Sequence, residues 1–135
     1  MGTNEEQDWA ECLSAASMEG DDSGARAMRA QAVLHAATTV EQMLKLSELQ
    51  TRVATILPKD KQSFALVLRQ RISEGWLGDD GRTLQNRGDI GHAIDTRNKI
   101  AHEKLQPTKG DAFRAVNTFH RVALILSPES SDQVP

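Results

Sequence analysis

Apolar side chains recur at every third or fourth position through much of the first half of the chain. Between Ala25 and Leu57 the sequence contains no glycine or proline, the residues that most often interrupt helices. Steps of three or four residues place side chains on one face of an α-helix. The pattern therefore predicts one long helix, or two nearly collinear helices, over 25–57. Its apolar stripe would consist of Met28, Ala32, Ala36, Val40, Met43, Leu46, Leu49, Val53 and Ile56.

One shorter helix is predicted on each side of this long one. A weak apolar stripe around Trp9 and Ala16 predicts a short first helix, preceded by a polar and flexible N-terminus at residues 1–8. Pro58 ends the long helix, and the following segment has a helical apolar face up to Gly75. The apolar positions of that segment are Phe64, Val67, Leu68 and Ile72.

Glycines divide the second half of the chain into shorter elements. Residues 78–81, Gly-Asp-Asp-Gly, predict a turn, and a short helix is expected at 82–87 before Gly88. Asp89 is then expected to cap a helix that ends between His102 and Leu105. The stripe of that helix contains Ile90, Ala93, Ile94, Arg97, Ile100 and Ala101.

The last predicted helix begins at residues 108–111, where Thr-Lys-Gly-Asp has the form of a helix-capping sequence, and runs to Leu126. Residues 127–135 contain two prolines and several small polar residues, and we expect a disordered tail there. The pattern predicts a compact all-α bundle of about five helices in one domain at 9–126. The apolar positions of the last helix are Phe113, Val116, Phe119, Ala123 and Leu126.

Composition agrees with a helical domain, and the charged residues are distributed unevenly along the chain. Tyrosine is absent, and Ala, Leu, Val, Ile and Met carry most of the apolar content, which suits helix packing. The formal net charge is -3. Residues 1–58 contain nine acidic and four Lys or Arg residues, whereas 59–135 contain ten acidic and twelve. The two parts therefore differ in net charge, -5 against +2. We expect any anionic partner to meet the second part.

Cysteine, histidine and glycine spacing argues against several classes of site. Cys12 is the single cysteine, so neither a disulfide framework nor a structural zinc site is expected. No two histidines stand four residues apart, and no glycine-rich phosphate loop is present, so we expect no metal and no cofactor. Trp9 and Trp76 are expected to anchor the core or an interface. The N-terminus is acidic and no stretch approaches the roughly 20 apolar residues of a membrane span. We therefore expect a soluble, unprocessed cytoplasmic protein.

One short run in the second half combines three groups suited to phosphate chemistry. Arg97 offers a planar fork of donors that stays charged, Asn98 can orient a partner or bind a phosphate oxygen, and His102 can transfer protons near neutral pH. Metal-free cleavage of RNA requires these roles. On a regular helix Arg97 and His102 lie roughly 140° apart. Either the helix unwinds near His102, or two copies of the chain share the site about a two-fold axis.

The same residues also have a purely structural interpretation. Cations in the last turns of a helix interact favourably with its carbonyl end, by about 0.3–1 kcal/mol. Lys99 stands four residues after Asp95, in the favourable orientation for an ion pair. Asn98 could bond to the local backbone.

A third possibility for the function of the protein is a small helical transcription regulator. It is weaker because the sequence contains no basic recognition helix.

The run Arg97-Asn98-Lys99-Ile100-Ala101-His102, late in an all-α chain, resembles the Arg-polar-x(3 to 5)-His signature of the HEPN superfamily of helical domains. The likeness in helical order extends from about Ala25 to Leu126. It implies a HEPN-like fold and a homodimeric, metal-independent endoribonuclease, with Arg97 and His102 catalytic and Asn98 supporting. RNA would be the substrate, and the products would have a 2′,3′-cyclic phosphate and a 5′-hydroxyl.

The resemblance also implies a biological setting and an alternative. Similar ribonucleases act in bacterial toxin-antitoxin, phage-defence or RNA-processing systems, so an antitoxin or other regulatory protein is a possible partner. Other members of the superfamily are inactive modules that dimerise or bind a nucleotide or protein. The sequence therefore leaves a non-catalytic binding module open as the alternative function.

Overall fold

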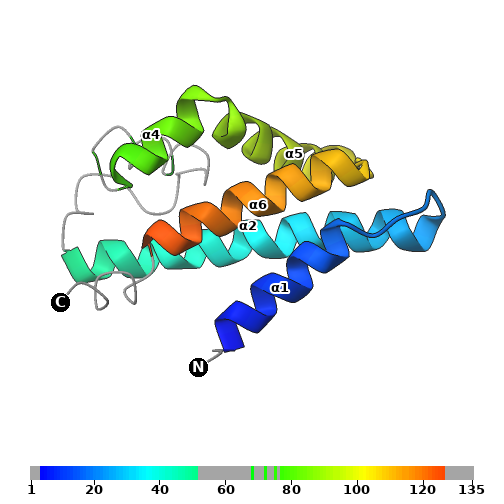
Figure 1. The fold of residues 1–135 in the computed structure, drawn as a ribbon, viewed down its shortest axis with the longest axis horizontal. Coiled ribbons are helices and arrows are strands. Elements are labelled where there is room, and N and C mark those ends of the chain that lie inside the picture. Colours follow the sequence, from blue (N-terminus) through cyan, green and yellow to red (C-terminus); the bar gives the residue numbers. More distant parts are fainter. Residues whose placement is uncertain (1–3, 52–67, 69–71, 73–74, 76, 127–135) are drawn as a thin grey trace.

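The computed structural model describes residues 4–51, 68, 72, 75 and 77–126. Within these ranges the chain forms five helices and no strand, which confirms the predicted all-α fold class (Figure 1). The helices are α1 (Asn4–Ala16), α2 (Ser23–Thr51), α4 (Gly78–Asn86), α5 (Asp89–Glu103) and α6 (Lys109–Leu126). Among the described residues no helix is both long and apolar enough to cross a membrane.

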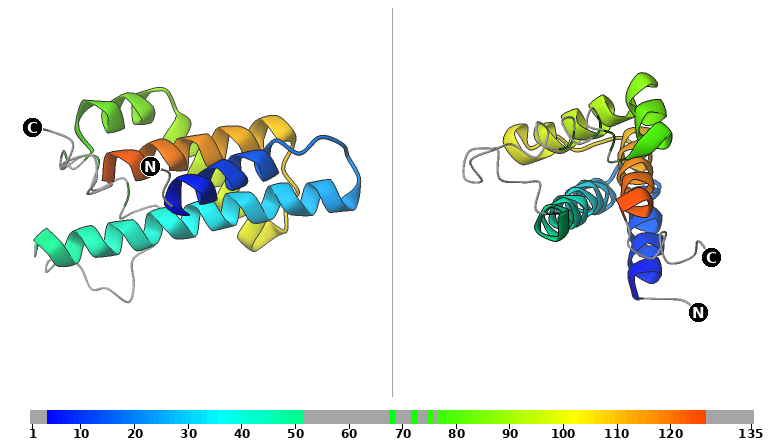
Figure 2. Two further views of the ribbon diagram at one scale, coloured as in Figure 1. Left: turned by 60° about the horizontal axis from the view of Figure 1, so that its bottom comes forward. Right: turned by 90° about the vertical axis from the view of Figure 1, so that its left-hand side faces the viewer.

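Helix α6 lies at the centre of the bundle. It packs against α2 along most of its length, against α5 and α4 on one side and against α1 on another (Figures 1 and 2). Phe119 of α6 is fully buried, as are Val33 and Val40 of α2 and Ile90 of α5. Many core positions facing these side chains are alanines, which allow the helix axes to approach closely. The alanines of the buried core cluster are Ala16, Ala32, Ala36, Ala37, Ala93, Ala112, Ala115 and Ala123.

The ends of the first two helices refine the sequence prediction. α1 begins at Asn4, so part of the segment expected to be flexible is helical. Acidic Glu6 in its first turn interacts favourably with the positive end of the helix dipole, which is one reason for the early start. The long helix is confirmed from Ser23 to Thr51 as a single element. Its expected continuation to Leu57 lies outside the described residues.

Two further expectations fall mainly on residues that are not described. Of the helix predicted after Pro58, only Leu68 and Ile72 are described, and both are buried in the core. Trp76 and the tail at 127–135 lie outside the described residues altogether.

The turn predicted at 78–81 is wrong, because these residues form the first turn of α4. The Gly81 amide donates to the Leu77 carbonyl at 3.1 Å, which closes that turn. A Cβ at position 81 would lie 2.3 Å from the Leu77 Cβ, so glycine is needed for close approach and not for chain reversal. Asp79 and Asp80 in the first turn also favour a helix start through the dipole.

Helix α5 begins differently from the prediction, whereas α6 begins as expected. Gly88, with φ of 80°, precedes α5, and Asp89 does not cap it. The Asp89 carboxylate instead accepts a hydrogen bond from Arg114 Nε on α6 at 2.9 Å and pairs with Arg87 at 3.5 Å. At the start of α6, the Asp111 amide donates to Thr108 Oγ1 at 3.2 Å, which confirms the predicted cap.

The apolar stripes on α2 and α6 are rotated slightly from those predicted. Met28 and Phe113, expected in the core, are exposed at 45% and 43%. Arg29 takes the buried position beside Met28, and Ala112 is buried beside Phe113. The neighbouring helices select the buried face, and an amphipathic pattern alone locates that face only to about one residue.

Candidate functional site

Helix α5 carries all three candidate residues in its last two turns. It remains α-helical through Glu103, and Lys104 ends it with a left-handed backbone conformation, φ 56°. The Leu105 amide then donates back to the Lys99 carbonyl at 3.1 Å. The helix end falls between His102 and Leu105, as predicted. The helix does not unwind at His102, so Arg97 and His102 remain about 140° apart around its axis and about 7.5 Å apart along it.

The Arg97 guanidinium is half-buried and bonded to a neutral partner. Its Nη1 donates to Asn98 Oδ1 at 2.9 Å, and no carboxylate pairs with it among the described residues. Asn98 is also half-buried, and because its oxygen accepts from Arg97, its amide NH₂ can donate elsewhere. Because the partner of the Arg97 guanidinium is neutral, the guanidinium keeps its charge uncompensated and its other N–H donors available to an anion.

Two lysines near the site, Lys99 and Lys109, pair with acids. Lys99 Nζ lies 3.1 Å from Asp95 Oδ2, which confirms the i,i+4 pair expected from the sequence. The hydrogen bond and charge of Asp95 raise the pKa of Lys99. Lys109 Nζ lies 2.8 Å from Glu19 Oε1, and this pair lowers the pKa of Glu19. Arg97 differs from both lysines because its charge has no acidic partner among the described residues.

His102 is solvent-exposed on another face of α5. Within the described part of the chain it makes no hydrogen bond to Arg97 or Asn98. The structure thus brings Arg97 and Asn98 together but leaves His102 apart from them in a single copy of the chain. His102 also has no second group in these ranges to orient its imidazole, which catalytic histidines commonly have.

A second histidine near the start of α5 has a structural role. His92 Nε2 lies 3.1 Å from Asp111 Oδ1 at the start of α6, and its Nδ1 is buried without a hydrogen-bond partner. Because a carboxylate oxygen only accepts, Nε2 is the donor in this contact. This contact joins α5 to α6 three turns before His102.

Sequence reasoning missed Arg29, which is 2% exposed. Its Nε donates to the Pro107 carbonyl at 3.0 Å, and its Nη1 donates to the carbonyls of Met18 and Gly20 at 2.7 and 2.9 Å. The bond to Pro107 fixes the loop that follows α5. A signal did exist in the sequence, because Arg29 stands at helical spacing from Ala25, Ala32 and Val33, all of which are buried.

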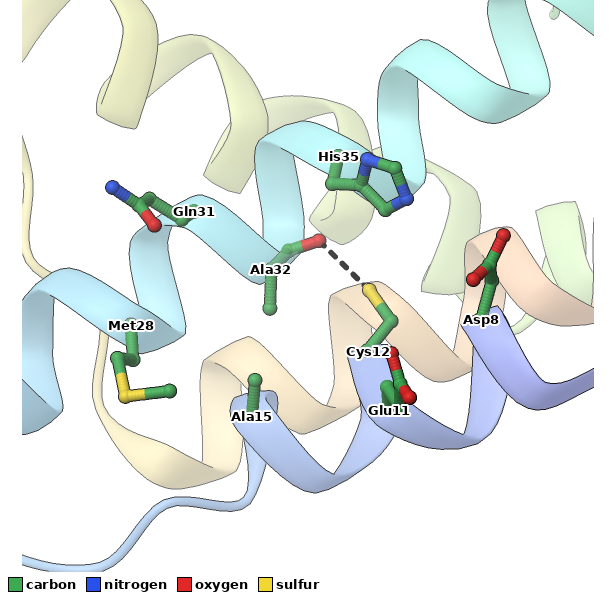
Figure 3. Close-up of a pocket in the computed structure, with 8 residues that line it drawn as sticks. All are labelled: Asp8, Glu11, Cys12, Ala15, Met28, Gln31, Ala32 and His35. Atoms are coloured by element: carbon green, nitrogen blue, oxygen red, sulfur yellow. Dashed lines mark hydrogen bonds between the residues drawn. The ribbon is translucent and has the colours of Figure 1, made fainter.

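A separate pocket of about 230 Å³ lies between α1 and α2 (Figure 3). Asp8 and Glu11 approach from α1, and His35 and Met28 from α2. The Cys12 thiol at its wall donates to the Ala32 carbonyl at 3.1 Å. Burial raises the pKa of Cys12 to about 11, so the sulfur stays a thiol and is a poor nucleophile.

Two further observations bear on cofactors and on the remaining aromatic groups. No cluster of three or more His, Cys, Asp or Glu side chains suited to a metal ion occurs among the described residues. Trp9 stacks on His120 with ring centroids 4.9 Å apart and an interplanar angle of 24°, which joins α1 to α6. Trp9 thus anchors the core edge, as the sequence indicated.

Comparison with known proteins adds no relative: no protein-family model matches the chain, and no match is found among the curated proteins or the solved structures.

Proposed function

We propose that the protein is a HEPN-like, metal-independent endoribonuclease whose active site is shared by two copies of the chain. Arg97 binds the scissile phosphate, Asn98 supports it, and His102 of the opposing copy transfers the proton. The proposed setting is the bacterial cytoplasm, in a toxin-antitoxin or phage-defence system.

The observation that carries this proposal is the state of Arg97. A half-buried guanidinium is costly to hold without a counter-charge, and here its one hydrogen-bond partner in the described ranges is the Asn98 amide oxygen. An RNA phosphodiester supplies the missing negative charge and matches the planar fork of donors.

The geometry of α5 supports the proposed dimer. Because the helix is regular through Glu103, the Arg97 and His102 side chains of one copy point in different directions. A two-fold axis beside α5 would bring His102 of the partner subunit towards Arg97. By symmetry, it would also bring His102 of the first copy towards Arg97 of the partner subunit. Each dimer would then contain two equivalent sites.

The chemistry assigned to this site is an internal transesterification. His102 takes the proton of the ribose 2′-hydroxyl, whose oxygen bonds to phosphorus while the bond to the 5′-oxygen breaks. The 5′-oxygen leaves as a hydroxyl after it receives a proton from water, and protonated His102 returns its proton to the hydroxide that remains. Arg97 and the Asn98 NH₂ donate to the phosphate oxygens, where negative charge accumulates in the transition state. The products are a 2′,3′-cyclic phosphate and a 5′-hydroxyl.

The test is an RNA cleavage assay in EDTA with structured and single-stranded RNAs. We expect cleavage with the stated product ends, and we expect Arg97→Ala and His102→Ala each to lower the rate by about 10²-fold or more. Lys109→Gln removes a paired charge and serves as the control with unchanged activity. Intact RNA with the wild-type protein, or equal rates for all four proteins, would rule out the proposed activity.

A non-catalytic binding module is the second candidate, and the exposure of His102 favours it. No group in the described residues orients that imidazole, as acid-base catalysis commonly requires. In this alternative Arg97 still binds a phosphate of a nucleotide or RNA, but His102→Ala leaves the affinity unchanged and no product forms.

A further inference from the structure

Lys104 adopts a backbone conformation that its residue type disfavours. Its φ of 56° makes it the one non-glycine residue with a positive φ in the described part of the chain. The position that ends a helix in this way is usually glycine, or asparagine, because a Cβ is strained there. A lysine at this position opposes a local conformational preference, which points to a role for its side chain.

The charge of Lys104 is also unpaired in the described part of the chain. Lys99 and Lys109, on either side of it, form ion pairs with Asp95 and Glu19. Lys104 is exposed and makes no ion pair with any described residue. Its ammonium group is therefore free to meet an anion from solution.

Its location connects it to the proposed site. Lys104 comes two residues after His102 and seven after Arg97, and seven residues correspond to about two turns of an α-helix. The α-carbons of Arg97 and Lys104 therefore lie on nearly the same line along α5, about 10 Å apart. The hydrogen bond from the Leu105 amide to the Lys99 carbonyl holds this turn against the end of the helix.

We propose that Lys104 is a substrate-binding residue that contacts an RNA phosphate next to the one held by Arg97. This inference rests on the proposed ribonuclease function and extends it by one contact with the substrate backbone. The role is electrostatic and independent of base sequence, as phosphate contacts generally are. It also explains a lysine at a position where glycine would be less strained.

A simpler explanation is that Lys104 complements the carbonyl end of α5. The two explanations differ in what they predict for the melting temperature and the RNA affinity when Lys104 is replaced by Asn or by Gly. Loss of a dipole contact would lower the melting temperature and leave RNA affinity unchanged. Loss of a phosphate contact would weaken RNA binding, while relief of backbone strain would keep the melting temperature equal or raise it by up to about 4 °C.

The experiment measures fluorescence anisotropy of a labelled, single-stranded 2′-O-methyl RNA over a range of KCl concentrations. This RNA has no free 2′-hydroxyl and cannot be cleaved by the proposed reaction. For Lys104→Asn we expect the Kd to rise about 3- to 10-fold and the slope of log Kd against log salt to fall by about 0.7, the value for one phosphate contact on a single strand. Lys104→Arg should retain both values. Lys109→Gln, which removes a paired lysine, is the matched control and should also retain them.

The outcomes separate this inference from the function on which it rests. Affinity that depends on Arg97 but is identical in wild type and Lys104→Asn overturns the role of Lys104 alone. Weaker binding together with a lower melting temperature and an unchanged salt slope also overturns it, because the role is then structural. Absence of RNA binding by the wild-type protein overturns the proposed function and the Lys104 contact together.

Discussion

Arg29 on α2 donates a hydrogen bond from its Nε to the carbonyl of Pro107, 78 residues later in the chain, at 3.0 Å. The same guanidinium bonds to two carbonyls in the connection between α1 and α2. One buried side chain therefore fixes both that connection and the loop that leaves the end of α5.

Substitution of Arg29 should destabilise the fold. Arg29→Met removes three hydrogen bonds and leaves the buried Pro107 carbonyl without its donor, so we expect the free energy of unfolding to fall by about 2–4 kcal/mol. Urea unfolding followed by circular dichroism would measure the change. Arg26→Met, at an exposed position on the same helix, is the control and should stay within about 0.5 kcal/mol of wild type. Equal midpoints for the two variants would show that the Arg29 bonds add no stability.

A shared active site predicts that two inactive variants restore each other. In a heterodimer of Arg97→Ala and His102→Ala chains, one of the two sites keeps both side chains. We therefore expect the heterodimer, purified with two different tags, to have about half the wild-type cleavage rate. A heterodimer of Arg97→Ala with the double variant has no intact site and is the negative control. A heterodimer as inactive as its parents, beside an active wild type, would mean that each chain builds its own site.

The single thiol should be unreactive in the native protein. Burial raises the pKa of Cys12 to about 11, so the thiolate fraction at pH 8 is very small. We expect iodoacetamide to modify the folded protein at least about a hundredfold more slowly than the urea-unfolded protein, in which the pKa returns to about 8.5. Mass spectrometry gives both rates without ambiguity because the chain has one cysteine. Similar rates in both states would show that the pocket between α1 and α2 opens readily.

The stacked pair of Trp9 and His120 predicts a loss of stability in acid. Burial, with a smaller effect of the nearby Arg121 charge, lowers the pKa of His120 below its usual 6.5. The unfolded chain therefore binds a proton at a higher pH than the folded one. The contribution of neutral His120 is fully present above about pH 6.5 and is lost as the pH falls below that value towards the folded pKa.

Urea unfolding of wild type and His120→Phe at pH 7 and pH 5 would measure this effect. Phenylalanine retains a ring against Trp9 but cannot be protonated. We expect the unfolding midpoint of wild type to fall further between the two pH values than that of the variant. Carboxylate effects, including that of Glu19, are common to both proteins and cancel in the comparison. Equal pH dependence would assign the acid sensitivity to other groups.

Local sequence patterns predicted the elements that carry the candidate site. The helix containing Ile90, Ile94 and Ile100, its end after His102 and the Thr108 cap of the next helix all follow from interactions within a few residues. Residues 78–81 were mispredicted because the need for glycine at position 81 arises from contact with Leu77, and a glycine in a turn gives the same sequence signal.

By itself, the sequence determined the all-α class, the long helix and the presence of Arg97, Asn98 and His102 on one helix, since helical periodicity and caps are local properties. Tertiary structure decided which of two adjacent residues is buried, and so placed Arg29 in the core and Met28 at the surface. It also decided the state of the site: α5 stays regular through Glu103, Asn98 holds Arg97, and His102 faces solvent. Which face of a helix is buried depends on contacts between residues distant in the chain, and a local pattern does not contain those contacts. The bond between adjacent Arg97 and Asn98 and the regular course of α5 are local, but they depend on side-chain rotamers and helix geometry that the pattern of residue types leaves open.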